Sequence, residues 1–119
     1  MQISNRDAQI VGKIIKYCNE IKRTHENFNN NKDLFLDKEN GFIYRNSISM
    51  PILQIGELVK NLSDDFKSEH HTVPWRDIAR MRDYFAHRYG TMDYEMTWNT
   101  SVEDVPELKE YLEKLEIKF

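Results

Sequence analysis

The sequence of 119 residues is poor in residues that break helices or form cross-links, with four glycines, three prolines and one cysteine. Scarce Gly and Pro favour long helices over a turn-rich β fold. The single cysteine, Cys18, excludes an internal disulfide and fits a small buried hydrophobe in a reducing compartment. No apolar run approaches the length of a membrane span, and residues 1–6 do not look like a signal peptide. We therefore expect a cytoplasmic protein with one domain over residues 1–119.

Charge is nearly balanced overall but uneven along the chain. The net charge of −3 argues against a protein that binds nucleic-acid backbone without specificity. Residues 75–90 nevertheless carry four arginines against two aspartates, which favours a localised phosphate-sized site. The adjacent His70 and His71 lack a second ligand pair at suitable spacing, so we expect no metal and no cofactor.

Hydrophobic residues recur at helical spacing along most of the chain. Ser4 is a predicted N-cap for a first helix, whose buried stripe includes Val11, Ile14, Ile15, Cys18, Ile21 and His25. Residues 33–36 predict a short turn of helix, and residues 42–62 a longer helix. Within the longer one, Pro51 predicts a kink near residues 47–50 or a second helix beginning there.

The second half continues this pattern. Residues 63–72 predict a polar connector with at most a turn of helix, residues 75–89 a helix closed by Gly90, and residues 92–98 a short helix. Ser101 is a predicted N-cap for the last helix. The fold class is therefore all-α, an up-and-down bundle of four to six helices.

The helix over residues 75–89 carries an arginine on an apolar stripe, which consists of Trp75, Ile78, Arg82, Phe85 and Tyr89. A buried guanidinium is costly without an anion. We therefore expect either an acidic partner opposite Arg82 or a cleft in which a ligand supplies the negative charge. Asp83 and His87 are four residues apart, so the carboxylate is placed to orient the imidazole.

Residues 82–89, with the sequence RDYFAHRY, resemble the Arg-x4-His-x-Tyr motif of HEPN-domain proteins, in particular the HepT toxin branch. Further matches follow the same order along most of the chain: Ile55-Gly56-Glu57, Val73-Pro74-Trp75, Asp93 and Trp98. Asp83 departs from the pattern, since Asn is frequent after the arginine. Gly56 also predicts a close approach of another backbone, and Glu57 is either a solvated acid or a residue near the site.

The resemblance implies a metal-independent endoribonuclease toxin of a type VII HepT/MntA-like toxin–antitoxin system. In this interpretation Arg82 and His87 are catalytic, Asp83 and Glu57 support them, and RNA is the substrate. The implied partner is an MntA-like nucleotidyltransferase antitoxin, which inactivates the toxin by AMPylation of Tyr89. Without the resemblance, the position of Tyr89 on the stripe favours an aromatic of the core or of an interface.

We also expect a homodimer, because the stripe that begins at Trp75 carries more apolar area than one small bundle obviously covers. Arg82 and His87 lie about 140° apart around a helix. Their convergence on one phosphate needs the reach of Arg82, a loosening of the helix after Phe85, or residues donated by a second copy. Two alternatives stay open. One is a non-catalytic subunit that binds substrate for a nucleotidyltransferase. The other is a helical dimer in which Arg82 makes only a structural ion pair.

Overall fold

The computed structural model describes residues 3–87 and 93–115, and the side chains of residues 85–87 lie outside the description. The described residues form helices and no strands. The elements are α1 (Asn5–Asn27), α2 (Lys32–Leu36), α3 (Phe42–Lys60), α4 (Asp64–Glu69), α5 (Trp75–His87), α6 (Tyr94–Asn99), the π-helical turn η2 (Thr100–Asp104) and α7 (Val105–Glu113). Because α6, η2 and α7 follow one another without a break, the described chain forms six helices, as predicted. None of the described helices is both long and apolar enough to cross a membrane.

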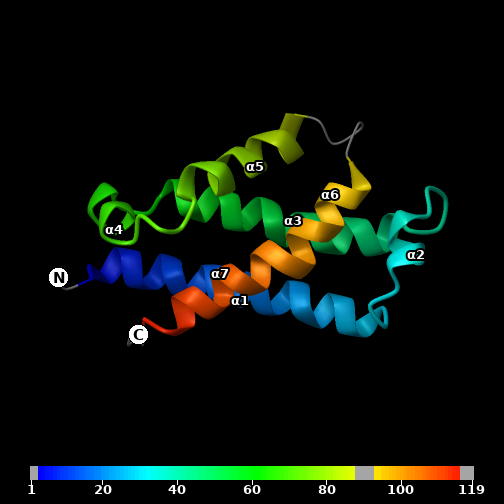
Figure 1. The fold of residues 1–119 in the computed structure, drawn as a ribbon, viewed down its shortest axis with the longest axis horizontal. Coiled ribbons are helices and arrows are strands. Elements are labelled where there is room, and N and C mark those ends of the chain that lie inside the picture. The colour runs from blue at the N-terminus through cyan, green and yellow to red at the C-terminus, as the bar shows by residue number, and fades with distance from the viewer. Residues whose placement is uncertain (1–2, 88–92, 116–119) are drawn as a thin grey trace.

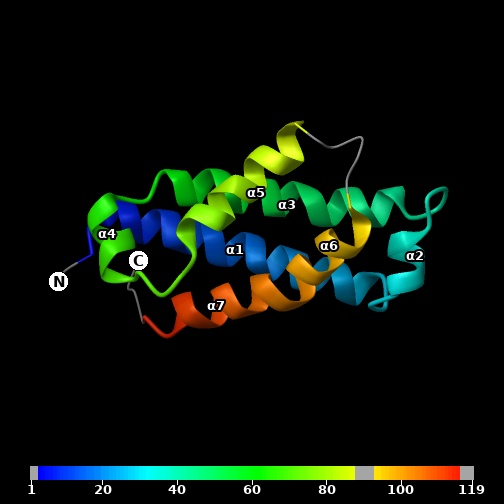
Figure 2. The same cartoon turned by 45° about the horizontal axis from the view of Figure 1, so that its top comes forward.

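The two longest helices, α1 and α3, lie side by side, and α5 and α7 pack across them (Figures 1 and 2). The start of α1, α4 and the end of α7 lie at one end of the bundle, and α2 lies at the other. Ser4 caps α1 as predicted, since its hydroxyl accepts a hydrogen bond from the Asp7 amide. The core is aliphatic between α1, α3 and α7 and includes Cys18, where burial raises the thiol pKa to about 12.

One sequence expectation about helix ends is wrong, and one alternative of another is excluded. The helix α3 passes through Pro51 without interruption, which excludes a second helix beginning near residues 47–50, and the predicted kink there stays a prediction. Ser101 lies inside the π turn and does not cap the last helix; its hydroxyl donates to the carbonyl oxygen of Trp98 at 2.7 Å. The polar connector also contains slightly more helix than expected, because Ser63 caps the six-residue α4.

A buried polar cluster, called here the His25 cluster, joins α1, α3 and the π turn. The Nδ1 atom of His25 is 2.6 Å from the Tyr44 hydroxyl, and its Nε2 atom is 2.8 Å from the Ser101 hydroxyl. The one hydroxyl proton of Ser101 is directed at Trp98, so Ser101 accepts from Nε2–H, and Nδ1 accepts from Tyr44. This arrangement satisfies a neutral imidazole. Burial accordingly lowers the pKa of His25.

Candidate active site

The candidate site lies where α5 crosses α3, and Gly56 makes the crossing possible. A Cβ atom on Gly56 would lie 2.5 Å from the Cβ of Arg82 and 3.2 Å from its backbone N and Cα. Such distances are too short for ordinary packing, so α5 reaches this position only because residue 56 has no side chain. The predicted close approach at Gly56 is confirmed, and its neighbour on the other helix is Arg82.

Arg82 meets an acidic partner across this crossing. Its Nε atom is 3.0 Å from Oε2 of Glu57, the residue after the glycine. The Nε–H makes no well-aligned hydrogen bond within the described chain, so the contact is an ion pair between close charges. Both side chains keep contact with solvent, with 32% of the Arg82 side chain and 49% of the Glu57 side chain exposed. Of the two expectations for Arg82, the acidic partner is therefore the one observed.

Asp83 extends this pair to Lys60 on α3. Its Oδ1 atom is 2.7 Å from the Lys60 ammonium and 3.4 Å from NH1 of Arg82. The hydrogen bond from Lys60 is the main reason that the pKa of Asp83 is lowered, and Arg82 adds to the effect. We call Glu57, Lys60, Arg82 and Asp83 the Arg82 cluster. Sequence reasoning missed Lys60, although its place three residues after Glu57 puts it on the same side of α3.

The remaining predicted site residues lie at or beyond the end of this helix. His87 is the last residue of α5, and its side chain is outside the description; Tyr89 lies outside the described residues. The predicted contact between Asp83 and His87 therefore stays a prediction. The start of α6 is tied to α5, because the Asp93 amide donates to the Tyr84 hydroxyl at 3.2 Å.

Trp75, the first residue of the predicted apolar stripe, is covered within the bundle, whereas the side chains of Phe85 and Tyr89 lie outside the described residues. Trp75 is 7% exposed, packs on Phe66 of α4 and donates its indole N–H to the His70 carbonyl at 3.0 Å. The single bundle therefore covers this tryptophan, and the expectation of a dimer cannot rest on it. Exposed apolar side chains instead lie on α3, where Ile43 and Met50 are 57% and 56% exposed.

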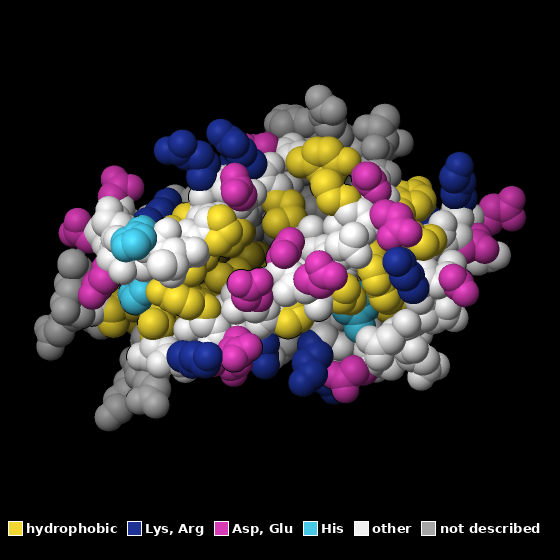
Figure 3. Space-filling model, viewed as in Figure 1, with side chains coloured by type: hydrophobic (Ala, Val, Ile, Leu, Met, Phe, Trp, Pro, Cys, Tyr) yellow, Lys and Arg dark blue, Asp and Glu magenta, His cyan; other side chains and the backbone are white. Residues whose placement is uncertain are grey.

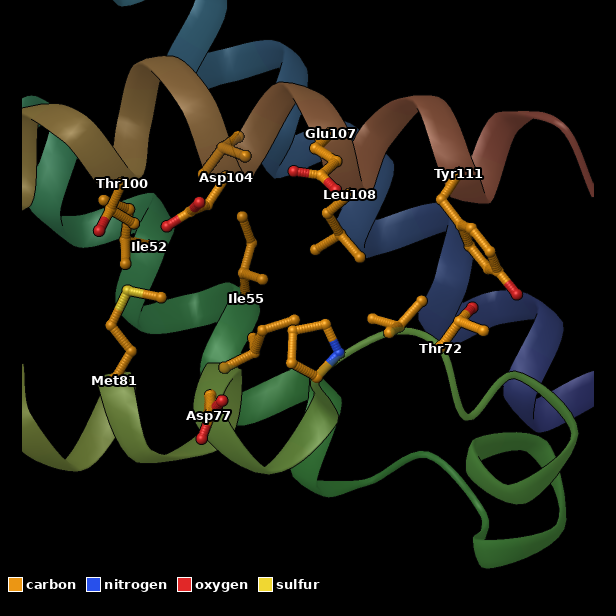
Figure 4. A pocket seen from close by; sticks show the side chains of 14 residues that line it. Ile52, Ile55, Thr72, Asp77, Met81, Thr100, Asp104, Glu107, Leu108 and Tyr111 are labelled. Carbon is orange, nitrogen blue, oxygen red and sulfur yellow. The ribbon is translucent and has the colours of Figure 1, made fainter.

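A hollow beside α5 is lined by Asp77, Ile78 and Met81 of this helix and not by Arg82. A cavity of about 430 Å³ separates α5 from the π turn and α7, with Ile55, Met81 and Leu108 among its walls (Figure 4). Its rim carries three carboxylates, those of Asp77, Asp104 and Glu107 (Figure 4).

The charge of this hollow decides what can enter it. Burial raises the pKa of Asp104, and the neighbouring Glu103 and Glu107 raise it further. Acidic side chains also cover the face along the π turn and α7, whereas Lys and Arg gather over α5 (Figure 3). A phosphate would be repelled from the acidic rim. Among the described residues, the Arg82 cluster is therefore the better candidate for an anionic substrate.

Comparison with known proteins finds similarity over most of the chain. The family model described as "Ribonuclease HepT-like" matches residues 14–115. "Probable ribonuclease HepT" from Thermococcus cleftensis is 40% identical over 84 residues, covering 71% of this chain and 73% of that protein. "Putative RNase TTE0752" from Caldanaerobacter subterraneus subsp. tengcongensis is 30% identical over 92 residues, covering 70% of this chain and 82% of that protein. No solved structure matches the chain significantly.

Proposed function

The chain belongs to the ribonuclease HepT-like family, and from this premise we propose that it is a metal-independent endoribonuclease whose catalytic residues are Arg82 and His87. One observation carries the proposal. Arg82 is fixed at the Gly56 crossing by Glu57, yet about a third of its side chain stays exposed, on the helix that ends at His87. A permanently charged, held and accessible guanidinium is the kind of group that binds a phosphate.

The proposed reaction is an internal transesterification of RNA. A base removes the proton from the ribose 2′-hydroxyl, whose oxygen attacks the adjacent phosphorus, and an acid protonates the leaving 5′-oxygen. The products are a 2′,3′-cyclic phosphate and a 5′-hydroxyl. His87 suits proton transfer because an imidazole titrates near neutral pH, and Arg82 suits the charge that develops on the phosphorane. DNA lacks the attacking hydroxyl and is therefore not cleaved.

Replacing His87 by Ala tests the catalytic assignment. We expect cleavage of a single-stranded RNA to be lost, while the helical circular dichroism and the melting temperature stay close to those of the unchanged protein. Product ends identified by mass spectrometry should carry a cyclic phosphate, and excess EDTA should not slow cleavage. A His87→Ala protein that cleaves at the original rate would remove His87 from the mechanism. RNA that is bound but never cleaved by either protein would favour the non-catalytic alternative.

The proposed assembly is a homodimer that packs through α3. Ile43, Met50 and Glu57 are spaced seven residues apart, so two exposed apolar side chains lie in line with the Glu57–Arg82 pair. A second copy seated on this stripe would cover apolar surface and bring two Arg82 clusters toward each other. Light scattering should give twice the monomer mass, and Met50→Lys should give the monomer mass. A monomer before substitution would contradict the proposal.

The proposed regulation is AMPylation of Tyr89 by an MntA-like nucleotidyltransferase antitoxin in a toxin–antitoxin pair. The hydrogen bond between Asp93 and Tyr84 is consistent with it, because it ties the start of α6 back to α5, the helix that carries Arg82. An adenylyl phosphate on Tyr89 would compete with RNA for the Arg82 guanidinium. Intact mass spectrometry after incubation with partner and ATP should show one added AMP, and Tyr89→Phe should stay unmodified and toxic. Equal modification of Tyr89→Phe would exclude this tyrosine as the acceptor.

A further inference from the structure

Two cations from different helices meet on one oxygen atom in the Arg82 cluster. The ammonium of Lys60, in the last turn of α3, is 2.7 Å from Oδ1 of Asp83, and NH1 of Arg82 is 3.4 Å from the same atom. The second carboxylate of the cluster, Glu57, contacts Arg82 at Nε, on a different edge of the guanidinium. The two cations are thus close enough to share a single anionic oxygen.

The oxygen that they share is held by a side chain that solvent can reach. Half of the Asp83 side chain is exposed, and so is about a third of the Lys60 side chain. A non-bridging phosphate oxygen and a carboxylate oxygen carry the same sign of charge and accept the same charge-assisted hydrogen bonds. An incoming phosphate oxygen can therefore compete with the Asp83 carboxylate for the two cations.

We propose that Lys60 is a second phosphate-binding residue of the RNA site, and that Asp83 occupies the phosphate position until RNA binds. The proposal rests on the ribonuclease function proposed above and adds a residue and an order of events to it. The RNA phosphate takes the place of the Asp83 carboxylate between Lys60 and Arg82, while Glu57 keeps Arg82 in position through Nε. The released Asp83 lies four residues before His87, the spacing at which it can accept a hydrogen bond from the imidazole.

The charge balance of the cluster predicts the direction in which each substitution changes the affinity for RNA. Lys60 and Arg82 carry two positive charges, and Glu57 and Asp83 carry two negative ones, so the cluster is neutral before RNA binds. Neutralising Asp83 leaves an excess positive charge, which favours phosphate. Removing Lys60 leaves an excess negative charge, which opposes it. A purely structural network predicts no such opposite effects on RNA affinity, because it makes no contact with the phosphate.

A matched pair of charges at the other end of the bundle provides the control. Lys32 of α2 and Glu95 of α6 also form an ion pair between helices, at 3.1 Å, with 43% and 58% of their side chains exposed. Lys32→Ala and Glu95→Gln change the net charge of the protein as Lys60→Ala and Asp83→Asn do. Any effect that depends only on net charge will therefore appear in both pairs.

The experiment measures binding apart from cleavage, by fluorescence anisotropy of a labelled single-stranded RNA with the full chain carrying His87→Ala. In this background Lys60→Ala should weaken binding about five- to tenfold and lower the slope of log affinity against log salt by about 0.7, the value for one lost phosphate contact. Lys60→Arg should restore the affinity, and Asp83→Asn should raise it about threefold. Lys32→Ala and Glu95→Gln should stay within about twofold of the background.

Each contrary result overturns a defined part of the account. If Lys60→Ala binds like Lys32→Ala, or if Asp83→Asn weakens binding, the shared phosphate position is wrong even when the protein with His87 cleaves RNA. If RNA is bound in the predicted order of affinities but never cleaved, the phosphate position stands and the ribonuclease function fails. If neither the His87→Ala protein nor its parent binds RNA, Lys60 has no phosphate role, and the cleavage assay decides the proposed function separately.

Discussion

The His25 cluster and the Arg82 cluster both join helices that are far apart in sequence, but they do so by different means. The His25 cluster is buried, with His25 and Tyr44 at 5% and 1% exposure, and each of its polar atoms described above pairs with another neutral group. Such a network gains its hydrogen bonds in a low dielectric and leaves nothing for a ligand to satisfy. Its contribution is to hold the π turn against α1 and α3.

The Arg82 cluster lies at the surface and is built from full charges. Water and salt screen its ion pairs, so they add little to stability, and an external anion can compete for the two cations. The comparison separates two roles. Substitutions in the His25 cluster should reduce folding stability more than RNA cleavage per folded molecule, and substitutions in the Arg82 cluster should do the reverse.

The largest stability loss is expected from His25→Ala. It removes a buried ring, opens a cavity and leaves the Tyr44 hydroxyl without its acceptor, at a combined cost of about 3 kcal/mol in the free energy of unfolding. Urea unfolding followed by circular dichroism measures it. Tyr44→Phe, which removes one hydroxyl and keeps the ring, should cost about 1 to 2 kcal/mol. If both variants unfold at the original urea midpoint, the His25 cluster does not hold the fold.

Gly56→Ala should reduce both folding stability and RNA cleavage, because it adds a methyl group where α3 and α5 touch. The added methyl would lie 2.5 Å from the Cβ of Arg82, so α5 must move away from α3. Overpacking of this kind costs about 1 to 3 kcal/mol. RNA cleavage per folded molecule should also fall, since Arg82 loses its position beside Glu57.

Gly12, which lies within α1, offers the matched control. Because alanine favours helix over glycine by about 0.5 to 1 kcal/mol, Gly12→Ala should keep or raise the melting temperature. Cleavage by Gly12→Ala should be unchanged. A Gly56→Ala protein as stable and as active as Gly12→Ala would show that the close crossing is not needed.

The smallest effect is a pH dependence that distinguishes the two clusters. Burial lowers the pKa of His25 from its usual 6.5, so the unfolded chain takes up a proton at a higher pH than the folded chain does. The free energy of unfolding therefore does not depend on the titration of His25 well above pH 6.5. It falls as the pH drops below 6.5, by at most about 1.4 kcal/mol per pH unit. Urea titrations between pH 7.5 and 5.5 should show this slope, and His25→Gln should flatten it.

Asp83 titrates in a different window. Lys60 holds the pKa of Asp83 below its usual 3.8, so the stability that this carboxylate contributes is present above pH 3.8 and is lost as the pH falls through the lowered pKa. The slope between pH 7.5 and 5.5 should therefore be the same in Asp83→Asn as in the unchanged protein. A change of slope in Asp83→Asn would show that the slope between pH 7.5 and 5.5 does not come from the His25 cluster alone.

Local patterns in the sequence predicted much of this architecture. The core stripe of α1, the Ser4 cap and the close approach at Gly56 each follow from properties of one helix or one residue type. Arg82 was recognisable because a cation on an apolar stripe needs an anion. That the anion is Glu57 depends on how two helices cross, and so does the pairing of Lys60 with Asp83, which no local pattern contains.

The sequence-based errors have the same physical origin. Ser101, followed three residues later by Asp104, is a normal N-cap pattern, but the hydrogen bond from His25 holds Ser101 inside a π turn. Trp75 is covered because α4, which is longer than the single turn expected, brings Phe66 over it. In both cases a tertiary contact decided between local alternatives of similar energy.

The most direct test of the central claim is a paired measurement on Arg82→Ala: the rate of cleavage of a single-stranded RNA and the free energy of unfolding in urea. If Arg82 is there to bind the reacting phosphate, cleavage should fall at least about 100-fold, as expected when a preorganised charge is removed from a transition state. The free energy of unfolding should fall by no more than about 1 kcal/mol, because the ion pairs that are lost are partly open to solvent. A protein that unfolds more readily by several kcal/mol, or that still cleaves RNA within about threefold of the original rate, would contradict this account.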